Sequence, residues 1–296
     1  MKTRLKRGIA AAAAVLAATT AVTIGAAGDS VAQATGLRAF GITGDGTLMA
    51  TFTTDQPQVL NWVQTVMGLV GDKSLIGIDF RVQDGLLYGV GNAGGIYTIS
   101  TPPPNPPVPT PVVAKKVSQL SVPLDGTTFG VDFNPAADRL RVISDNGQNL
   151  RHNLANNSTI ADPYLTTPPV SGTTGGVTAA AYTNNDLDPG TGTTLFDLNT
   201  LTDQVVIQSP ANNGTLAPTG ALGVDAGLNA GLDIYSDLAG RKTVSNTAFA
   251  AVVPSGGSAT LFSVNLLTGA AAVMPLGQFP LNITDVAIAL DPDPNN

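Results

Sequence analysis

The chain contains no cysteine, no glutamate and a single histidine, His152, in 296 residues. The absence of cysteine excludes disulfide bonds, zinc–thiolate sites, iron–sulfur clusters and cysteine nucleophiles. Mechanisms that need two histidines or a glutamate are excluded as well. Only 12% of the residues are charged, whereas about a quarter is usual for a soluble protein. Aspartate, arginine and the amide and hydroxyl side chains are therefore the main groups left for site chemistry.

Aspartate, glycine and proline are plentiful instead. All 21 acidic residues are aspartates, and the chain has 33 glycines and 21 prolines. Aspartate and asparagine compete with the helical backbone for hydrogen bonds and therefore favour turns. Threonine and valine, which are also common here, favour strands. This composition predicts an all-β protein with many tight turns.

The N-terminus has the layout of a secretory signal peptide. Four basic residues within the first seven positions precede an uncharged, alanine-rich run over 8–24, and Ala32-Gln33-Ala34 has the small residues of a cleavage site. A membrane anchor would need about 20 strongly apolar residues. We therefore predict a signal peptide over 1–34, one mature domain over 35–296, and no transmembrane segment. The protein should be secreted or periplasmic.

Cleavage after Ala34 is directly testable. N-terminal sequencing of the protein recovered outside the cytoplasm should begin at Thr35. An intact Met1 in the membrane fraction would contradict this prediction. The mature chain would keep 10 of the 14 Lys and Arg residues and 20 of the 21 acidic residues, a net charge of −10. Such an acidic balance argues against nucleic acid or an anionic membrane as a partner.

Similar short segments recur about every 50 residues along the mature chain. The triplets are Gly77-Ile78-Asp79, Gly130-Val131-Asp132 and Gly223-Val224-Asp225, and the segments at 179–182 and 285–288 resemble them. If Ile78, Val131, Ala180, Val224 and Val286 are equivalent, the separations are 53, 49, 44 and 62 residues. Propeller blades of four strands repeat every 40–50 residues or so. The period therefore predicts a β-propeller.

Two further strand patterns lie between these segments. One pattern recurs at 96–100, 195–199 and 261–265, and the other at 86–90, 139–143 and 248–252. The last strand, over 283–290, has no strands after it, and the first strands, from 37 to about 70, have none before them. We expect these ends to share a blade and close a ring of five blades. Six blades are the alternative if 223–277 divides differently, and a β-sandwich is the runner-up.

Two segments fit the strand pattern less directly. Residues 59–70 have apolar positions at helical spacing, but their valine, tryptophan and threonine content favours a strand. Residues 101–111 contain seven prolines, so they cannot pair within a central sheet. We expect a stiff, polyproline-like surface loop there. A ligand for a proline-recognition module is the alternative.

The densest polar stretch runs from Gly130 to Asn153. Strand alternation places Arg139 and Arg141 on one face, and Asn149 and Arg151 also share a face. Clustered guanidinium groups are typical of a site for carboxylate, sulfate or phosphate. Internal ion pairs that hold one blade to the next are the structural alternative.

The candidate ligand-binding residues are the polar side chains of this stretch and of the related segments. They are Asp79, Arg81, Asp132, Asn134, Arg139, Arg141, Asn149, Arg151, Tyr182 and Asn184. For a metal, the loop with Asp186 and Asp188 offers oxygen ligands that suit calcium, and a solvated turn is the alternative. No catalytic residue is assigned, because a serine triad would have to use His152 and no Gly-x-Ser-x-Gly turn is present.

Several motifs resemble a family of bacterial secreted proteins that is known only as a domain of unknown function. They are Asp79-Phe80-Arg81, the stretch over 130–153, the segment over 181–185, and Gln208 with Asn212, Gly214 and Leu216. The resemblance extends over about 37–292 and is most specific in Asp-Arg-Leu-Arg-Val and Gly-Gln-Asn-Leu-Arg. It departs at Val82, where the family tends to have proline, and in the insertion over 102–111. It implies a propeller-like fold and no activity, cofactor or catalytic residue.

These observations together predict a binding or interaction module. We expect a monomer that recognises an extracellular or envelope ligand. A hydrolase or lyase on an extracellular polymer, using aspartate and arginine in the central channel, is one alternative. A structural envelope or matrix protein is the other.

Overall fold

The computed structural model describes residues 36–104, 106, 108 and 110–292. The predicted signal peptide lies outside these residues. The described chain forms twenty strands and one 3-10 helix, η1 (Ala211–Asn213). No helix within this part of the chain has the length and apolarity to cross a bilayer.

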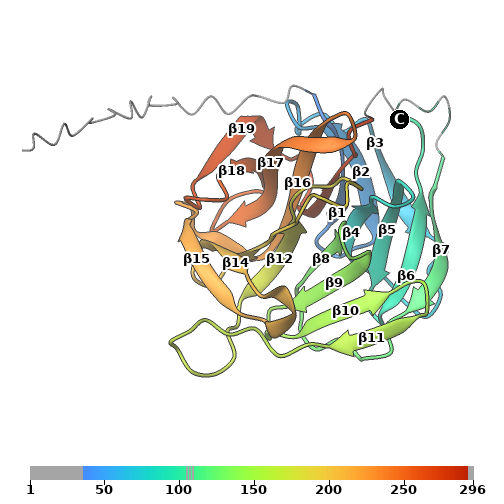
Figure 1. Cartoon of the computed structure of the whole chain (residues 1–296). Helices are drawn as coiled ribbons and strands as arrows, with labels where there is room; N and C mark the ends of the chain where they lie inside the picture. Colours follow the sequence, from blue (N-terminus) through green and yellow to red (C-terminus); the bar gives the residue numbers. More distant parts are fainter. Residues whose placement is uncertain (1–35, 105, 107, 109, 293–296) are drawn as a thin grey trace, which may run out of the picture. The chain divides into compact units, whose positions relative to one another are not determined.

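The strands form five four-stranded blades around a common axis (Figure 1). Blade 1 contains β20 (Ile283–Ile288), β1 (Arg38–Thr43), β2 (Leu48–Thr53) and β3 (Trp62–Met67). Blade 2 contains β4 (Leu75–Arg81), β5 (Leu86–Gly91), β6 (Gly95–Ser100) and β7 (Val112–Gln119). Blade 3 contains β8 (Phe129–Asn134), β9 (Arg139–Ser144), β10 (Asn149–Asn153) and β11 (Ser158–Ala161).

The remaining strands form the last two blades. Blade 4 contains β12 (Val177–Tyr182), β13 (Leu195–Asn199), β14 (Gln204–Gln208) and β15 (Leu216–Ala221). Blade 5 contains β16 (Ala226–Ala239), β17 (Lys242–Pro254), β18 (Thr260–Val264) and β19 (Ala271–Gln278). Within each blade the strands pair antiparallel. Blades 1 and 2 also join at their outer edges, where β3 and β7 pair in parallel.

The ring closes through the last strand, as the sequence predicts. β20 pairs antiparallel with β1, with Val286 opposite Gly41. The inner strands β4, β8, β12, β16 and β20 pack against one another in that order and return to β4. Apolar side chains between neighbouring blades form the core, and Val286 and Ile288 are buried in it. The predicted five-bladed propeller is confirmed.

One predicted repeat lies in the wrong place. The triplet at Gly223 precedes β16, and the equivalent triplet is Gly231-Leu232-Asp233. With Leu232 as the equivalent point, the separations become 53, 49, 52 and 54 residues. A Cβ on Gly231 would lie 2.4 Å from Asp285 Cα, whereas one on Gly223 would meet nothing within 4 Å. Close approach of inner strands therefore requires glycine at 231.

A second prediction grouped strands that hold different places in their blades. The segments at 96–100 and 261–265 lie in third strands, β6 and β18, but the segment at 195–199 is β13, a second strand. β13 pairs directly with the inner strand β12, with Leu195 opposite Tyr182. The three segments share a sequence pattern because second and third strands of a blade are both buried on their two faces. The pattern therefore does not distinguish a second strand from a third.

The two ambiguous segments follow the prediction. Residues 62–67 form the strand β3, not a helix. The proline-rich segment connects β6 to β7, and its described residues belong to no strand. Because proline has no backbone N–H, this run cannot contribute to the hydrogen-bonded ladder on either side of it.

Candidate functional site

Glycines bring the inner strands close together at the propeller axis. A Cβ on Gly77 would lie 2.4 Å from Val131 Cγ2, and one on Gly130 would lie 2.6 Å from the backbone nitrogen of Ala180. Real Cβ contacts are longer than this, so these positions do not accept a larger residue without displacing the next blade. The repeated glycine is thus explained by packing between blades.

An aspartate follows two residues later in three of the inner strands. Strand alternation puts each aspartate on the same face as its glycine. Each carboxylate accepts a hydrogen bond from the backbone of the next inner strand. The bonds are Phe133 N to Asp79 Oδ2 (2.7 Å), Tyr182 N to Asp132 Oδ1 (3.1 Å) and Ile288 N to Asp233 Oδ2 (2.5 Å). Each aspartate therefore links its blade to the next one.

The two other junctions use different side chains. Asp285 Oδ2 accepts the N–H of Ile78 (2.8 Å) and links blade 1 to blade 2. In blade 4, the position equivalent to these aspartates is occupied by an alanine, Ala181. Blade 4 therefore has no carboxylate there to bind the next blade. Its link to blade 5 comes from Asn185 instead. The Asn185 amide donates to the Ile234 carbonyl (3.1 Å), and its backbone N–H donates to Ser236 Oγ (2.8 Å).

The axial carboxyl groups lie close to one another in a buried position. One oxygen of Asp79, of Asp132 and of Asp233 lies within 4.8 Å of the other two. Burial raises the pKa of Asp79 well above its ordinary value, and repulsion from Asp233 adds to the shift. Burial and repulsion from Asp79 raise the pKa of Asp132 in the same way. Burial also raises the pKa of Asp233, to about 6. The surroundings of these three groups therefore disfavour their charged forms.

A polar cavity opens at the amino ends of the inner strands, and we call it the N-side pocket. Its volume is about 350 Å³. Its polar lining side chains are Thr43, Asp45, Ser74, Asn92, Thr127, Thr128, Asn229, Thr284 and Asp285. Asp285 also belongs to the axial layer, because its carboxylate lies beside Gly77 and Gly231. The pocket thus leads toward the axial aspartates.

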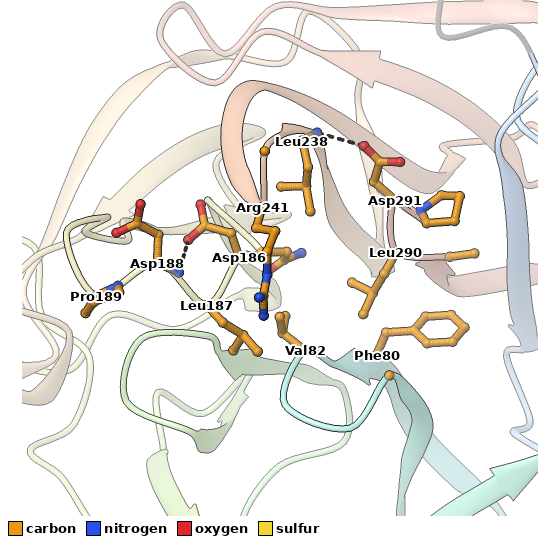
Figure 2. Close-up of a pocket in the computed structure, with 15 residues that line it drawn as sticks. Phe80, Val82, Asp186, Leu187, Asp188, Pro189, Leu238, Arg241, Leu290 and Asp291 are labelled. Carbon is orange, nitrogen blue, oxygen red and sulfur yellow. Dashed lines mark hydrogen bonds between the residues drawn. The ribbon is translucent and has the colours of Figure 1, made fainter. Parts of the chain in front are cut away.

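A larger cavity opens at the carboxyl ends of the inner strands, and we call it the C-side pocket (Figure 2). Its volume is about 680 Å³. Segments of blades 1, 2, 4 and 5 converge on it. The polar lining side chains are Asn185, Asp186, Asp188, Arg241 and Asp291, and the apolar ones are Phe80, Val82, Leu187, Pro189, Leu238, Ala289, Leu290 and Pro292.

Backbone hydrogen bonds hold the carboxylates of the C-side pocket in place. Asp186 accepts the N–H groups of Asp188 (2.9 Å) and Thr243 (2.8 Å). Asp291 Oδ2 accepts the N–H of Leu238 (2.7 Å). Figure 2 shows Asp186 and Asp291 on different walls, with the Arg241 side chain extending into the cavity. The pocket thus combines fixed acceptors, a guanidinium donor and apolar walls.

A third polar cluster is buried between blades 3 and 4 and centres on Arg141, which is 1% exposed. Its guanidinium donates to four side chains. They are Tyr182 Oη (3.3 Å), Asn149 Oδ1 (2.6 Å), Asp162 Oδ2 (2.7 Å) and Asn212 Oδ1 (2.8 Å). Arg151 pairs with the same Asp162 (2.8 Å). Both ion pairs lie within blade 3, so they are internal but do not hold one blade to the next; the contacts of Arg141 with blade 4 are the hydrogen bonds to Tyr182 and Asn212.

Two side chains of this buried region have oxygens without a hydrogen-bond partner among the described residues. In Asp197, which is fully buried, neither carboxylate oxygen has a partner, and in Gln208 the side-chain oxygen Oε1 has none. Burial raises the pKa of Asp197 well above its ordinary value, and the charge of Arg141 opposes the shift. Arg141 and Asp197 are buried, whereas Asn212 at the edge of the cluster is exposed.

Comparison with known families identifies the family to which the chain belongs. The family described as "Domain of unknown function (DUF4394)" matches residues 48–289. The chain belongs to this family. The match confirms the resemblance seen in the Arg141 stretch and in the neighbouring motifs. No curated protein matches this member of the DUF4394 family.

Several solved structures resemble this DUF4394 domain at low identity. Glutaminyl cyclase from Myxococcus xanthus is 11% identical with a TM-score of 0.44, over 73% of this chain and 90% of that one. A chain of a nidogen/laminin complex is 10% identical with a TM-score of 0.45, over 86% and 99%. The WD40 domain of Toxoplasma gondii coronin is 14% identical with a TM-score of 0.38, over 79% and 55%. Similarity at this level transfers no function to the DUF4394 domain.

The sequence-predicted site residues fall into separate places in this DUF4394 domain. Arg141, Asn149, Arg151 and Tyr182 come together in the cluster around Arg141, and Asp79 and Asp132 lie on the axis. The remaining candidates are nearer the surface. Arg81 forms ion pairs with Asp84 and Asp138. Arg139 donates to the carbonyls of Ala137 and Asp138, and Asn134 accepts the N–H of Ala137. The Asn184 side chain accepts a hydrogen bond from the Asn246 amide. Their binding of a ligand stays a prediction.

Sequence reasoning missed most of the residues around the axis and its two openings. Asp233 and Asp285 were not among the candidates, although Asp233 follows a glycine by two residues as Asp79 does. Arg241 lies in the turn between β16 and β17, and Asp291 follows β20. Neither residue belongs to a segment that recurs in the sequence. Asp197 had one signal, an aspartate at a buried position within the apolar strand β13. The predicted calcium loop with Asp186 and Asp188 contributes to the C-side pocket.

Proposed function

We propose that this protein is a ligand-binding propeller that acts outside the cytoplasm and holds a polyhydroxylated ligand, such as a segment of an envelope glycan, in the C-side pocket. The observation that carries the proposal is the convergence of four blades on one cavity of about 680 Å³. Ligand sites are typically concave, about 300–1,000 Å³, and combine apolar walls with a few fixed polar groups. The predicted signal peptide supports a location outside the cytoplasm.

The chemistry of the lining favours hydroxyl groups on the ligand. Carboxylates such as Asp291 only accept hydrogen bonds when ionised, and the guanidinium of Arg241 only donates them. A hydroxyl group does both, so a ligand with many hydroxyls can satisfy acceptors and donors side by side. The apolar faces of sugar rings would contact the walls formed by Leu187, Leu238 and Leu290. The pocket offers both kinds of contact.

A glycan array probed with the labelled mature protein identifies the ligand, and calorimetry then measures its affinity for variants. Asp291→Asn should weaken binding tenfold or more, because a hydrogen bond to a charged group contributes about 1.5–3 kcal/mol. The asparagine oxygen can still accept the N–H of Leu238, so the fold should be kept. Leu187→Ala should weaken binding through the lost apolar contact.

Asp225→Asn is the matched control, since Asp225 is exposed and lines neither axial pocket. It removes the same charge and should leave the affinity unchanged. The proposal is wrong if no glycan binds, or if Asp291→Asn and Asp225→Asn behave alike. The hydrolase alternative is tested on the same material by measuring new reducing ends after incubation with the bound glycan.

A further inference from the structure

An exposed apolar surface lies at the outer edge of blades 1 and 2, where β3 and β7 pair in parallel (Figure 1). The pairing places Val66 opposite Val112, and both are buried. It places Met67 opposite Val113, and both are exposed. Side chains that lie directly opposite each other in a sheet point to the same face. The exposed faces of the two blades therefore form one continuous surface outside the core.

We call this surface the rim patch. Its large apolar side chains are 37–61% exposed, and they are Val63, Met67, Val70, Val113 and Val117. Strand alternation puts Val63 on the same face as Met67. Single exposed apolar side chains are common on any protein, whereas a group of them on one face is typical of an interaction surface.

Lysines surround the apolar side chains of the rim patch. Three of the four lysines of the predicted mature chain lie here, and they are Lys73, Lys115 and Lys116. Lys115 is exposed on the same face of β7 as Val113. The Lys116 ammonium donates to the carbonyl of Val70 (3.0 Å), which keeps it beside the apolar side chains. None of the ion pairs among the described residues includes one of these lysines.

Acidic residues are absent from the segments that form the rim patch. The stretches 56–71 and 85–124 contain neither aspartate nor glutamate, although the predicted mature chain has 20 aspartates. Asp72 is buried, and its carboxylate accepts the hydroxyl of Tyr97 (2.5 Å). The net charge of the chain argues against an anionic membrane, but salt screens charges that lie more than about 10 Å away. The charge that a partner meets at the rim patch is therefore positive.

The composition of the rim patch favours a lipid surface over a protein partner. Protein interfaces are enriched in aromatic residues and arginine and depleted in lysine, whereas the rim patch consists of valine, methionine and lysine. Lysine side chains extend along apolar surface and leave the ammonium group at the level of lipid headgroups. A second copy of the chain on this patch would bring the lysines of both copies together, with no carboxylate from the segments 56–71 and 85–124 to oppose them.

We propose that the rim patch is a docking surface for a lipid bilayer with anionic headgroups. Val63, Met67 and Val113 would enter the headgroup region, and Lys73 and Lys115 would contact the lipid phosphates. The propeller would then lie on the membrane with the rim of blades 1 and 2 against it. The C-side pocket shares no lining residue with the rim patch, so this proposal does not depend on the glycan ligand.

Cosedimentation of the mature protein with lipid vesicles tests the proposal. One set of vesicles contains equal parts of phosphatidylcholine and phosphatidylglycerol, and the other contains phosphatidylcholine alone. We expect binding to the anionic vesicles that weakens at high salt, and little binding to the neutral ones. Met67→Gln combined with Val113→Thr should weaken binding tenfold or more, because apolar area no longer leaves water. Lys115→Gln should weaken binding about fivefold, through the loss of one charge beside an anionic surface.

Leu267→Gln and Lys242→Gln are the matched controls. Both side chains are exposed and lie in blade 5, so these variants should bind vesicles like the unchanged protein. Circular dichroism checks that every variant keeps its strands. The proposal is overturned if the unchanged protein does not bind the anionic vesicles, or if the rim-patch variants bind as well as the controls. It is also overturned if light scattering shows a dimer that Met67→Gln with Val113→Thr converts to a monomer, since the patch would then join two copies of the chain.

Discussion

Truncation before Asn282, which removes β20, should yield a chain that aggregates and has no cooperative thermal transition. β20 is the inner strand of blade 1 although it comes last in the sequence. Its side chains Ile283, Val286 and Ile288 are buried, and each contributes about 1.5–3 kcal/mol. Three such side chains are comparable with the net stability of a domain, about 5–15 kcal/mol.

The truncation also removes two junctions between blades. Asp285 no longer accepts the N–H of Ile78, and Asp233 loses the N–H of Ile288. The inner edge of β1 becomes unpaired, and unpaired edges promote aggregation. Circular dichroism melts and light scattering measure the effect. A truncation after Pro292, which keeps β20, is the control and should melt like the unchanged protein. A soluble β20 truncation with an unaltered melt would refute closure by this strand.

Arg141→Ala should lower the free energy of unfolding by about 3 kcal/mol, the lower end of the range of about 3–5 kcal/mol for breaking a buried ion pair. The substitution removes the donors to Asn149, Asp162 and Asn212 at once. Arg151 still pairs with Asp162, which limits the loss. Asp197, however, loses the positive charge that opposes the rise of its pKa.

Urea unfolding of Arg141→Ala and Arg139→Ala measures this difference. The side chain of Arg139 bonds only carbonyl oxygens of its own turn among the described contacts, so its removal should change the free energy of unfolding by less than about 1 kcal/mol. Phosphate and sulfate are added to both variants to test for an anion site. An unchanged stability of Arg141→Ala combined with lost anion binding would make the cluster a ligand site instead of a structural one.

Much of the blade architecture was predictable from local patterns. The sequence favours a strand over a helix within 59–70 because its side chains suit a half-buried sheet, and β3 lies there, over 62–67. The repeat is visible because three of the five blades need glycine where inner strands meet, at Gly77, Gly130 and Gly231. The mistake at Gly223 came from matching letters alone. Gly223 has a φ of 75°, which favours glycine locally. Gly231 is needed because Asp285 of the neighbouring inner strand lies against it, and that contact is a property of the assembled ring.

The sequence by itself determined the absence of thiol and multiple-histidine chemistry, the strand-and-turn composition, and a repeat of about 50 residues, since these depend on residue types and their spacing. Only the tertiary structure decided which polar residues meet. Asp79, Asp132, Asp233 and Asp285 come from four strands spread over about 200 residues, and their proximity exists only because the ring closes. The same closure brings Asp186, Arg241 and Asp291 to one pocket. Contacts between distant blades have no local pattern, so the sites could be located only in the folded protein.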